Sequence, residues 1–114
     1  MELKIIRSDD LATHVALVGK LDLAGVQQIE MKFTAGVAAR GKPAVVDLSE
    51  TTYLASLGLR ILLTTARALS GKGVKMVLLN PTEPVLQVLQ LSKFDAIMPV
   101  ETDLNRALAT AGVK

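Results

Sequence analysis

The chain has 114 residues, of which 50% are hydrophobic, 21% are charged and none is cysteine, and its formal net charge is +2. This length predicts one domain spanning residues 1–114, with enough aliphatic side chains to form a core without disulfides or metal. The small net charge, the lack of a dense Lys/Arg run and the 3% aromatic content argue against a nucleic-acid partner, and the lack of cysteine excludes thiol catalysis and thiolate metal sites.

The N-terminal segment MELKIIRSDD has no basic stretch followed by a long apolar one, so no signal peptide is predicted. No uninterrupted apolar run approaches the roughly 20 residues of a membrane helix, which argues against direct membrane insertion. We therefore expect a cytoplasmic protein, and the absence of cysteine fits a reducing compartment.

The first part of the chain predicts a hairpin followed by a helix. LKII (3–6) and THVALVGKL (13–21) have the composition of two strands joined by a polar turn. Asp22 is placed to cap a helix that runs to about residue 40, where Gly41 and Pro43 end it. The apolar residues of this helix share one face: Val26, Ile29, Phe33 and Val37.

The rest of the chain alternates strands and helices. In chain order we expect a strand at 44–48 covered on both faces, a connection at 49–56, a helix at 57–69, a strand at 74–79, a short helix within 80–92, an edge strand within 96–100 and a final helix capped by Thr102 or Asp103. Two strands separated by one helix form a βαβ unit, so part of the sheet should be parallel. The predicted fold class is α/β.

Motifs for catalysis are weak. GVAARGK (36–42) has the spacing of a phosphate-binding loop, but Pro43 stands where a Ser or Thr would hold magnesium, and the segment leads from a helix into a strand. His14 is the only histidine, and its place near the start of a strand predicts a position at the surface or at the end of a strand. A lone histidine with scattered carboxylates makes neither a catalytic triad nor a metal site, so we predict no enzyme, no cofactor and no metal.

Two segments, taken together, resemble the STAS domain family. GKLDLAGV (19–26) is similar to the G-x-L-D segment that leads into the first helix of these domains. VVDLSETTYLASLGLRILL (45–63) is similar to the strand, loop and helix that carry their D-L-S and S-x-G-L-R-x-L-L signatures, and the resemblance continues through 74–100. It implies a single STAS-like domain with a small mixed sheet of four to five strands and four helices packed mainly on one face. The best-known members of this size are bacterial anti-sigma factor antagonists.

The resemblance implies a partner-switching function. The unmodified antagonist binds an anti-sigma factor, typically a serine kinase of the histidine-kinase-like ATPase type, and thereby frees the sigma factor. The kinase phosphorylates a serine at the start of the second helix, which ends the interaction, and a PP2C-type phosphatase restores it. By motif position Ser56 is the phosphoacceptor. The residues implied in partner binding surround it: Asp22, Ala55, Leu57, Gly58, Arg60, Ile61 and Thr64.

The residues on either side of Ser56 depart from the family pattern. Many members have an aspartate before the serine and a second hydroxyl residue after it, where this chain has Ala55 and Leu57. Either the protein pairs with a divergent kinase, or it binds its partner without phosphorylation. The alternatives are therefore a serine that only caps a helix, worth about 1 kcal/mol, and a non-phosphorylated STAS scaffold subunit, for example in a transporter-associated complex. A small enzyme or nucleotide-binding domain is a third, disfavoured alternative.

A second set of residues on the 57–69 helix is offset from its core face: Leu57, Ile61, Thr64 and Ala68. This spacing fits a helix buried over a wide arc. It equally fits an apolar partner-binding face rimmed by Arg60 and Arg67.

Overall fold

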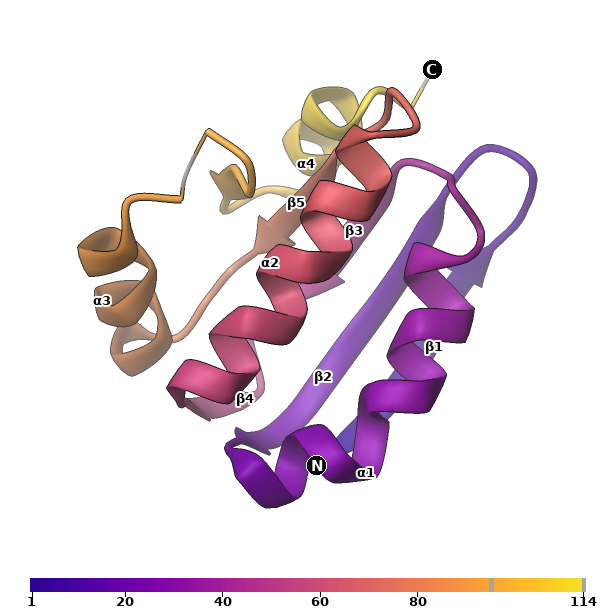
Figure 1. Cartoon of the computed structure of the whole chain (residues 1–114). Helices are drawn as coiled ribbons and strands as arrows, with labels where there is room; N and C mark the ends of the chain where they lie inside the picture. The colour runs from indigo at the N-terminus through magenta and orange to yellow at the C-terminus, as the bar shows by residue number, and fades with distance from the viewer. Residues whose placement is uncertain (95, 114) are drawn as a thin grey trace.

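The structure is a computed structural model that describes residues 1–94 and 96–113. Its elements are, in chain order, β1 (Glu2–Ser8), β2 (Thr13–Leu21), α1 (Leu23–Phe33), the π-helix η1 (Thr34–Ala38), β3 (Ala44–Asp47), β4 (Thr51–Leu54), α2 (Ser56–Ser70), β5 (Met76–Leu79), α3 (Glu83–Ser92), β6 (Val100–Glu101) and α4 (Leu104–Ala111). The strands form one six-stranded sheet in the order β1-β2-β3-β5-β6, with β4 paired to β2 (Figure 1). Within residues 1–94 and 96–113, β1–β2 is the one antiparallel pair, so the predicted mixed sheet with a parallel part is confirmed.

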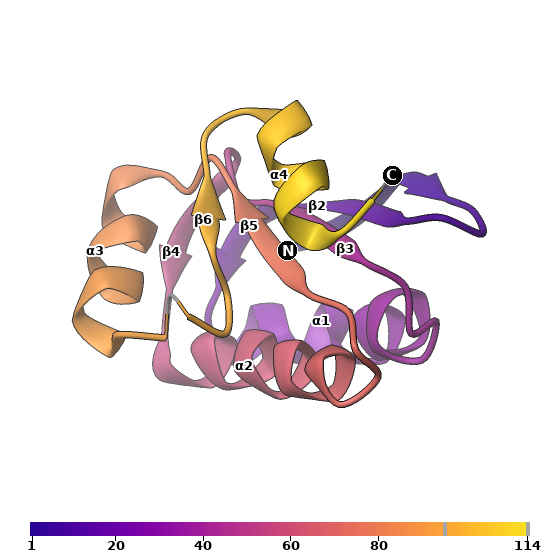
Figure 2. The same ribbon diagram turned by 90° about the horizontal axis from the view of Figure 1, so that it is seen from above.

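The sheet separates α1 and α2 from α4 (Figure 2). α1 and α2 lie side by side on one face, and α3 lies beyond the edge of the sheet near β4. The main buried cluster fills the space between these helices and the sheet and includes Phe33, Leu62, Leu69 and Val85. α4 covers the opposite face, where Ala107 and Ala111 pack against the β3 and β5 side chains. The predicted α/β architecture with helices mainly on one face is therefore present, with α4 as the helix on the other side.

β3 illustrates why both faces of the sheet are apolar. Val46 lies opposite Val15 of β2 and Leu78 of β5, and all three side chains belong to the main cluster under α1 and α2. The neighbouring Val45 points to the other face and packs in the α4 cluster. Alternate residues of a strand point to opposite faces, so a continuous apolar run is what a doubly covered strand requires.

β2 changes its parallel neighbour along its length. Thr13–Ala16 pair with β3, whereas Gly19–Leu21 pair with β4, with a register shift between Gly19 and Lys20. Gly19 has φ +115°, which glycine adopts with little strain. The expectation that residues 49–56 form only a connection is therefore wrong, because Thr51–Leu54 find hydrogen-bonding partners at the far end of β2. The sheet thus has six strands where four to five were expected.

Helix boundaries largely follow the predicted signals. Asp22 caps α1, as expected, because its Oδ1 accepts a hydrogen bond of 2.8 Å from the Gly25 N–H. The predicted helix up to residue 40 changes character after Phe33, where a π-helical turn takes over as far as Ala38. Of the two proposed caps for the last helix, Asp103 is the one used, since its Oδ2 accepts from the Arg106 N–H at 3.0 Å.

Two further expectations are corrected. The edge strand expected within 96–100 begins only at Val100, after Pro99, whose carbonyl accepts from the Leu78 N–H at 2.8 Å. Of the two positions expected for His14, the strand end is confirmed, since it is the second residue of β2. The surface position is wrong, because only 7% of the residue is accessible. It lies in β2 between its pairing partners Arg7 of β1 and Val45 of β3, so it has a neighbouring strand on each side within the sheet.

Candidate functional site

Ser56 is the first residue of α2 and is exposed. The N-cap position belongs to Ala55, whose backbone is extended (φ −91°, ψ 169°) and whose carbonyl accepts the N–H of Leu59 at 2.9 Å. The prediction that Ser56 caps the helix is therefore wrong. Its hydroxyl makes no hydrogen bond to any residue that the structure describes, which leaves an accessible oxygen at the start of the helix.

The start of α2 is tied to the start of α1 through one backbone hydrogen bond. The N–H of Ala55 donates to the carbonyl of Leu21 at 3.0 Å. Leu21 is the last residue of β2, and Ala55 follows the last residue of β4. The residues that come next, Asp22 and Ser56, therefore leave the same end of the sheet from adjacent strands. This end is the lower one in Figure 1, where α1 and α2 both begin.

Two glycines allow these helix starts to approach the sheet closely. A Cβ on Gly58 would lie 2.5 Å from the carbonyl oxygen of Leu21 and 2.6 Å from its Cγ. A Cβ on Gly25 would clash with the carbonyl oxygen of Lys20. Larger residues would therefore push α1 and α2 away from the end of β2. This close packing explains why the G-L-R part of the motif begins with a glycine, Gly58.

The predicted site residues fall into three groups by burial. Four are exposed and form the accessible surface at the start of α2: Ser56, Leu57, Arg60 and Thr64. Asp22 and Ala55 are half-buried, and the Asp22 carboxylate is already engaged in capping α1. Gly58 and Ile61 are buried, so they can support this surface from below but offer little to a partner.

Two grooves flank the exposed side of α2. The α1–α2 groove, of about 230 Å³, is lined by Val26, Glu30, Thr34, Leu57, Arg60, Ile61, Thr64 and Thr65. The α2–Phe94 groove, of about 350 Å³, is lined by Ser56, Leu59, Arg60, Leu63, Thr64, Arg67 and Phe94. Arg60 and Thr64 line both grooves, whereas Ser56 lines only the second.

Four residues of α2 are offset from its core face, and they were expected either to be buried or to form a partner-binding face. Each expectation holds for some of them. Ile61 is buried at 7% exposure, whereas Leu57 is 40% exposed and Thr64 and Ala68 are also exposed. The structure thus adds an accessible strip of mixed polarity beside the core face of α2. Arg60 and Arg67 are both exposed along it.

Sequence reasoning missed four residues that line these grooves. Glu30 of α1, Thr34 of η1 and Thr65 of α2 reach the first groove. Phe94, which follows α3, reaches the second. The first two could have been found, because Val26, Glu30 and Thr34 recur every four residues and share one helix face. No pattern in the sequence around Phe94 predicts that this residue lies beside α2. A turn in which Ile97 and Met98 donate to the Phe94 carbonyl holds that residue near α2.

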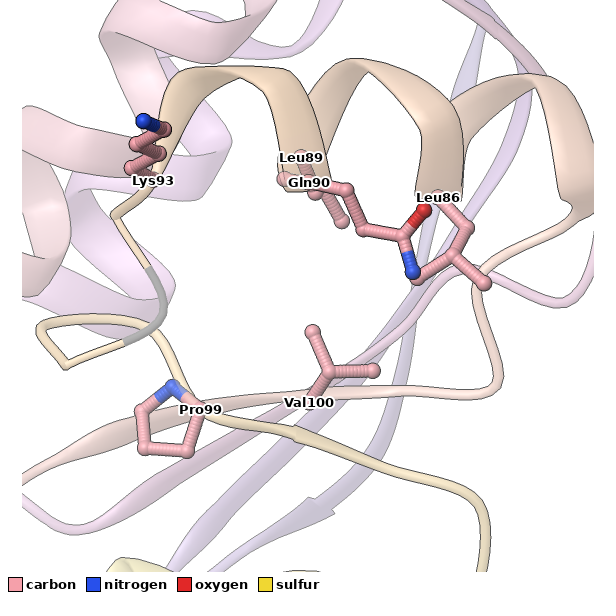
Figure 3. A pocket seen from close by; sticks show the side chains of 6 residues that line it. All are labelled: Leu86, Leu89, Gln90, Lys93, Pro99 and Val100. Carbon is pink, nitrogen blue, oxygen red and sulfur yellow. The ribbon is translucent and has the colours of Figure 1, made fainter.

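A larger cavity, of about 680 Å³, lies elsewhere (Figure 3). It is bounded by α3 and by the start of β6, and its lining consists of Leu86, Leu89, Gln90, Lys93, Pro99 and Val100. Figure 3 shows the Val100 side chain pointing toward α3 and the Gln90 amide extending toward Leu86. None of the predicted site residues lines it.

Other chemistry is sparse in the described residues. Across residues 1–94 and 96–113, no three His, Asp or Glu side chains cluster as metal ligands would. In the same residues, no helix has the length and apolar character needed to cross a membrane. The Nε2 atom of His14 is buried and has no hydrogen-bond partner among the described residues. Burial lowers the pKa of His14, and the nearby Arg7 lowers it further, against an opposing effect of Asp47.

Comparison with known proteins gives one consistent result. The family model for the STAS domain matches residues 3–107. BtrV of Bordetella bronchiseptica, a protein assigned as an anti-sigma factor antagonist, is 31% identical over 93 residues, which cover 82% of this chain and 80% of BtrV.

Solved structures agree at the level of the fold. An anti-sigma factor antagonist from Mycobacterium paratuberculosis has a TM-score of 0.81 at 24% identity and covers 96% of this chain and 94% of its own. The anti-sigma factor antagonist SpoIIAA in its unphosphorylated form has a TM-score of 0.78 at 21% identity and covers 99% of both chains. The phosphorylated form of the Bacillus SpoIIAA has a TM-score of 0.69 and covers 92% of this chain and 96% of its own.

Proposed function

The chain belongs to the STAS domain family, and on this premise we propose that it is an anti-sigma factor antagonist controlled by phosphorylation of Ser56. The curated relative that supports this function spans four fifths of the chain, and the family match spans residues 3–107 of the single domain that we propose over 1–114. The protein is thus a regulatory binding partner rather than an enzyme, acts in the cytoplasm and does not bind nucleic acid.

The observation that carries the proposal is the exposed hydroxyl of Ser56 at the first position of α2. A kinase can reach this oxygen without unfolding the domain. The added phosphate would sit beside the unpaired N–H groups of the first helical turn, which the helix dipole makes favourable for an anion. The core beneath remains in place, because the buried residues of α2 here are Gly58 and Ile61, whereas Ser56 is exposed.

Phosphorylation acts on the surface rather than on the fold. It adds about −1.5 to −2 charges at neutral pH. The exposed Leu57, Arg60 and Thr64 next to Ser56 form the surface that we assign to the anti-sigma factor. Ala55 and the carboxylate of Asp22 lie at its edge, half-buried. A new dianion within a docked surface opposes binding through repulsion and through the cost of removing it from water.

The partners we propose are a serine kinase of the histidine-kinase-like ATPase type, which is itself the anti-sigma factor, and a PP2C-type phosphatase. The direct experiment incubates the chain with each such kinase of the source genome and ATP, and maps the phosphate by mass spectrometry. We expect one phosphate, on Ser56, and none in a Ser56→Ala variant. The exposed Ser70 at the other end of α2 serves as an internal control for nonspecific transfer.

The alternative is a STAS scaffold subunit that binds its partner without modification, for example in a transporter-associated complex. Its support is the local sequence, since Ala55 and Leu57 replace the carboxylate and the second hydroxyl that many family members have around the serine. If no kinase of this class modifies Ser56 although the chain binds one of them, the scaffold function replaces the switch.

A further inference from the structure

We propose that the α2–Phe94 groove receives an acidic, apolar segment of the anti-sigma factor, and that a phosphate on Ser56 closes the groove to that segment. The inference rests on the proposed function and deepens it by naming where the partner docks and what chemistry it presents. It places the contact on the side of α2 away from α1.

The shape of the groove supports an apolar contact with a charged rim. Leu59, Leu63 and Phe94 are half-buried and give the groove its apolar lining. Arg60 and Arg67, seven residues apart and so on the same side of α2, are exposed beside them. Arginine flanked by apolar side chains is typical of the residues that dominate protein interfaces.

The charges select an acidic partner segment. Among the residues that the structure describes, the lining of the α2–Phe94 groove contains two arginines and no carboxylate. The one ion pair among the described residues joins Arg7 to Asp9, so within that part of the chain neither groove arginine is neutralised. The α1–α2 groove differs, because Glu30 lines it together with Arg60. An acidic segment is therefore better matched by the groove that also contains Ser56.

The position of Ser56 then explains how modification would act. Ser56 lines the same groove as Arg60, which follows it by four residues, one helical turn further along. A phosphate on Ser56 would be placed to pair with the Arg60 guanidinium, because side chains four residues apart are neighbours on a helix surface. The phosphate would pair with the arginine that would otherwise bind the partner's carboxylates. It would also repel those carboxylates directly.

The test measures the affinity of the chain for the anti-sigma factors of the histidine-kinase-like ATPase class encoded in the source genome, each purified. Arg60→Gln and Arg67→Gln are compared with Arg106→Gln, which removes the same charge from the exposed surface of α4 on the other face of the sheet. Each groove variant should bind about threefold to thirtyfold more weakly. The Arg106→Gln protein should bind as the unmodified chain does. The weakening should shrink at high salt, because exposed charges are screened.

Each outcome decides one question. If the unmodified chain binds none of these anti-sigma factors, the proposed function fails and this inference fails with it. If it binds one, and Arg60→Gln and Arg67→Gln bind it as tightly as Arg106→Gln, only the groove assignment is overturned. Self-association of the chain that Arg60→Gln abolishes would assign the groove to a second copy and would also overturn the inference. Circular dichroism of all three variants checks that the fold is unchanged.

Discussion

Gly58 and Leu21 are packed so closely that a single methyl group on Gly58 would lie 2.5 Å from the Leu21 carbonyl oxygen. The same carbonyl accepts the hydrogen bond from Ala55 that ties the two helix starts together. The position of Ser56 on the surface therefore depends on a backbone contact two residues away from it. The motif around Ser56 combines an accessible serine with a glycine that fixes where the serine stands.

The first prediction concerns this contact. Gly58→Ala should lower the free energy of unfolding by about 1–3 kcal/mol, because the backbone of α2 must move to relieve the overlap. Gly36→Ala is the matched control, since a Cβ at Gly36 meets nothing within 4 Å. That variant should be neutral or gain up to about 1 kcal/mol, as expected for alanine in a helical segment. Chemical denaturation of both proteins measures the difference, and equal stabilities would refute the packing account.

The second prediction separates capping from accessibility. Asp22→Ala should cost about 1 kcal/mol of stability, because it removes the side chain that accepts from the Gly25 N–H. Ser56→Ala should change stability by less than about 0.5 kcal/mol, since Ser56 is exposed and is not the N-cap. Thermal unfolding compares the two variants. A larger loss for Ser56→Ala than for Asp22→Ala would mean that the serine caps the helix after all.

The third prediction concerns the residue before the serine. Ala55 occupies the N-cap with an extended backbone and no side-chain hydrogen bond. Aspartate is among the best N-cap residues, so Ala55→Asp should stabilise the protein by about 1 kcal/mol. Ala55→Leu gives the comparison, because it adds bulk at the same position without a capping oxygen. No gain for Ala55→Asp over Ala55→Leu in urea denaturation would show that the N-cap lies elsewhere.

The fourth prediction concerns pH. Burial lowers the pKa of His14 below its ordinary value of 6.5, so the unfolded chain binds a proton more readily than the folded one. Stability should therefore be fully present above pH 6.5 and should fall as the pH decreases from 6.5 toward the lowered pKa of His14. Below that pKa both states carry the proton, and this contribution falls no further.

His14 is the only histidine, so a His14→Gln variant isolates the effect. Its free energy of unfolding should be nearly flat in this pH range, whereas that of the unmodified chain should slope. Parallel profiles for the two proteins would assign the slope to groups other than His14.

Local sequence signals predicted the parts of the fold that depend on nearby residues. The limits of β2, the cap at Asp22 and the apolar face of α1 followed from alternation, side-chain chemistry and helical spacing. β4 was missed because a four-residue strand is defined by its partner, and that partner is the distant end of β2. The burial of His14 was missed for the same reason, since strands β1 and β3 flank it within the sheet.

The candidate site likewise has features that the local sequence predicted and features that depend on residues distant in the chain. The motif located Ser56 and Arg60 correctly on the exposed start of a helix. The general preference for serine at N-caps gave the wrong role to Ser56, because the bond between Ala55 and Leu21 sets where α2 begins. The α2–Phe94 groove could not be foreseen, since tertiary folding alone brings Phe94 to α2.

The most direct test of the central claim is the affinity of the anti-sigma factor for the chain before and after phosphorylation of Ser56, measured by titration calorimetry. The unmodified chain should bind, and the phosphorylated chain should bind on the order of a hundredfold more weakly or not detectably, because a dianion then lies within the docked surface. Ser56→Ala should bind like the unmodified chain. Equal affinity of the phosphorylated and unmodified chains would contradict the switch.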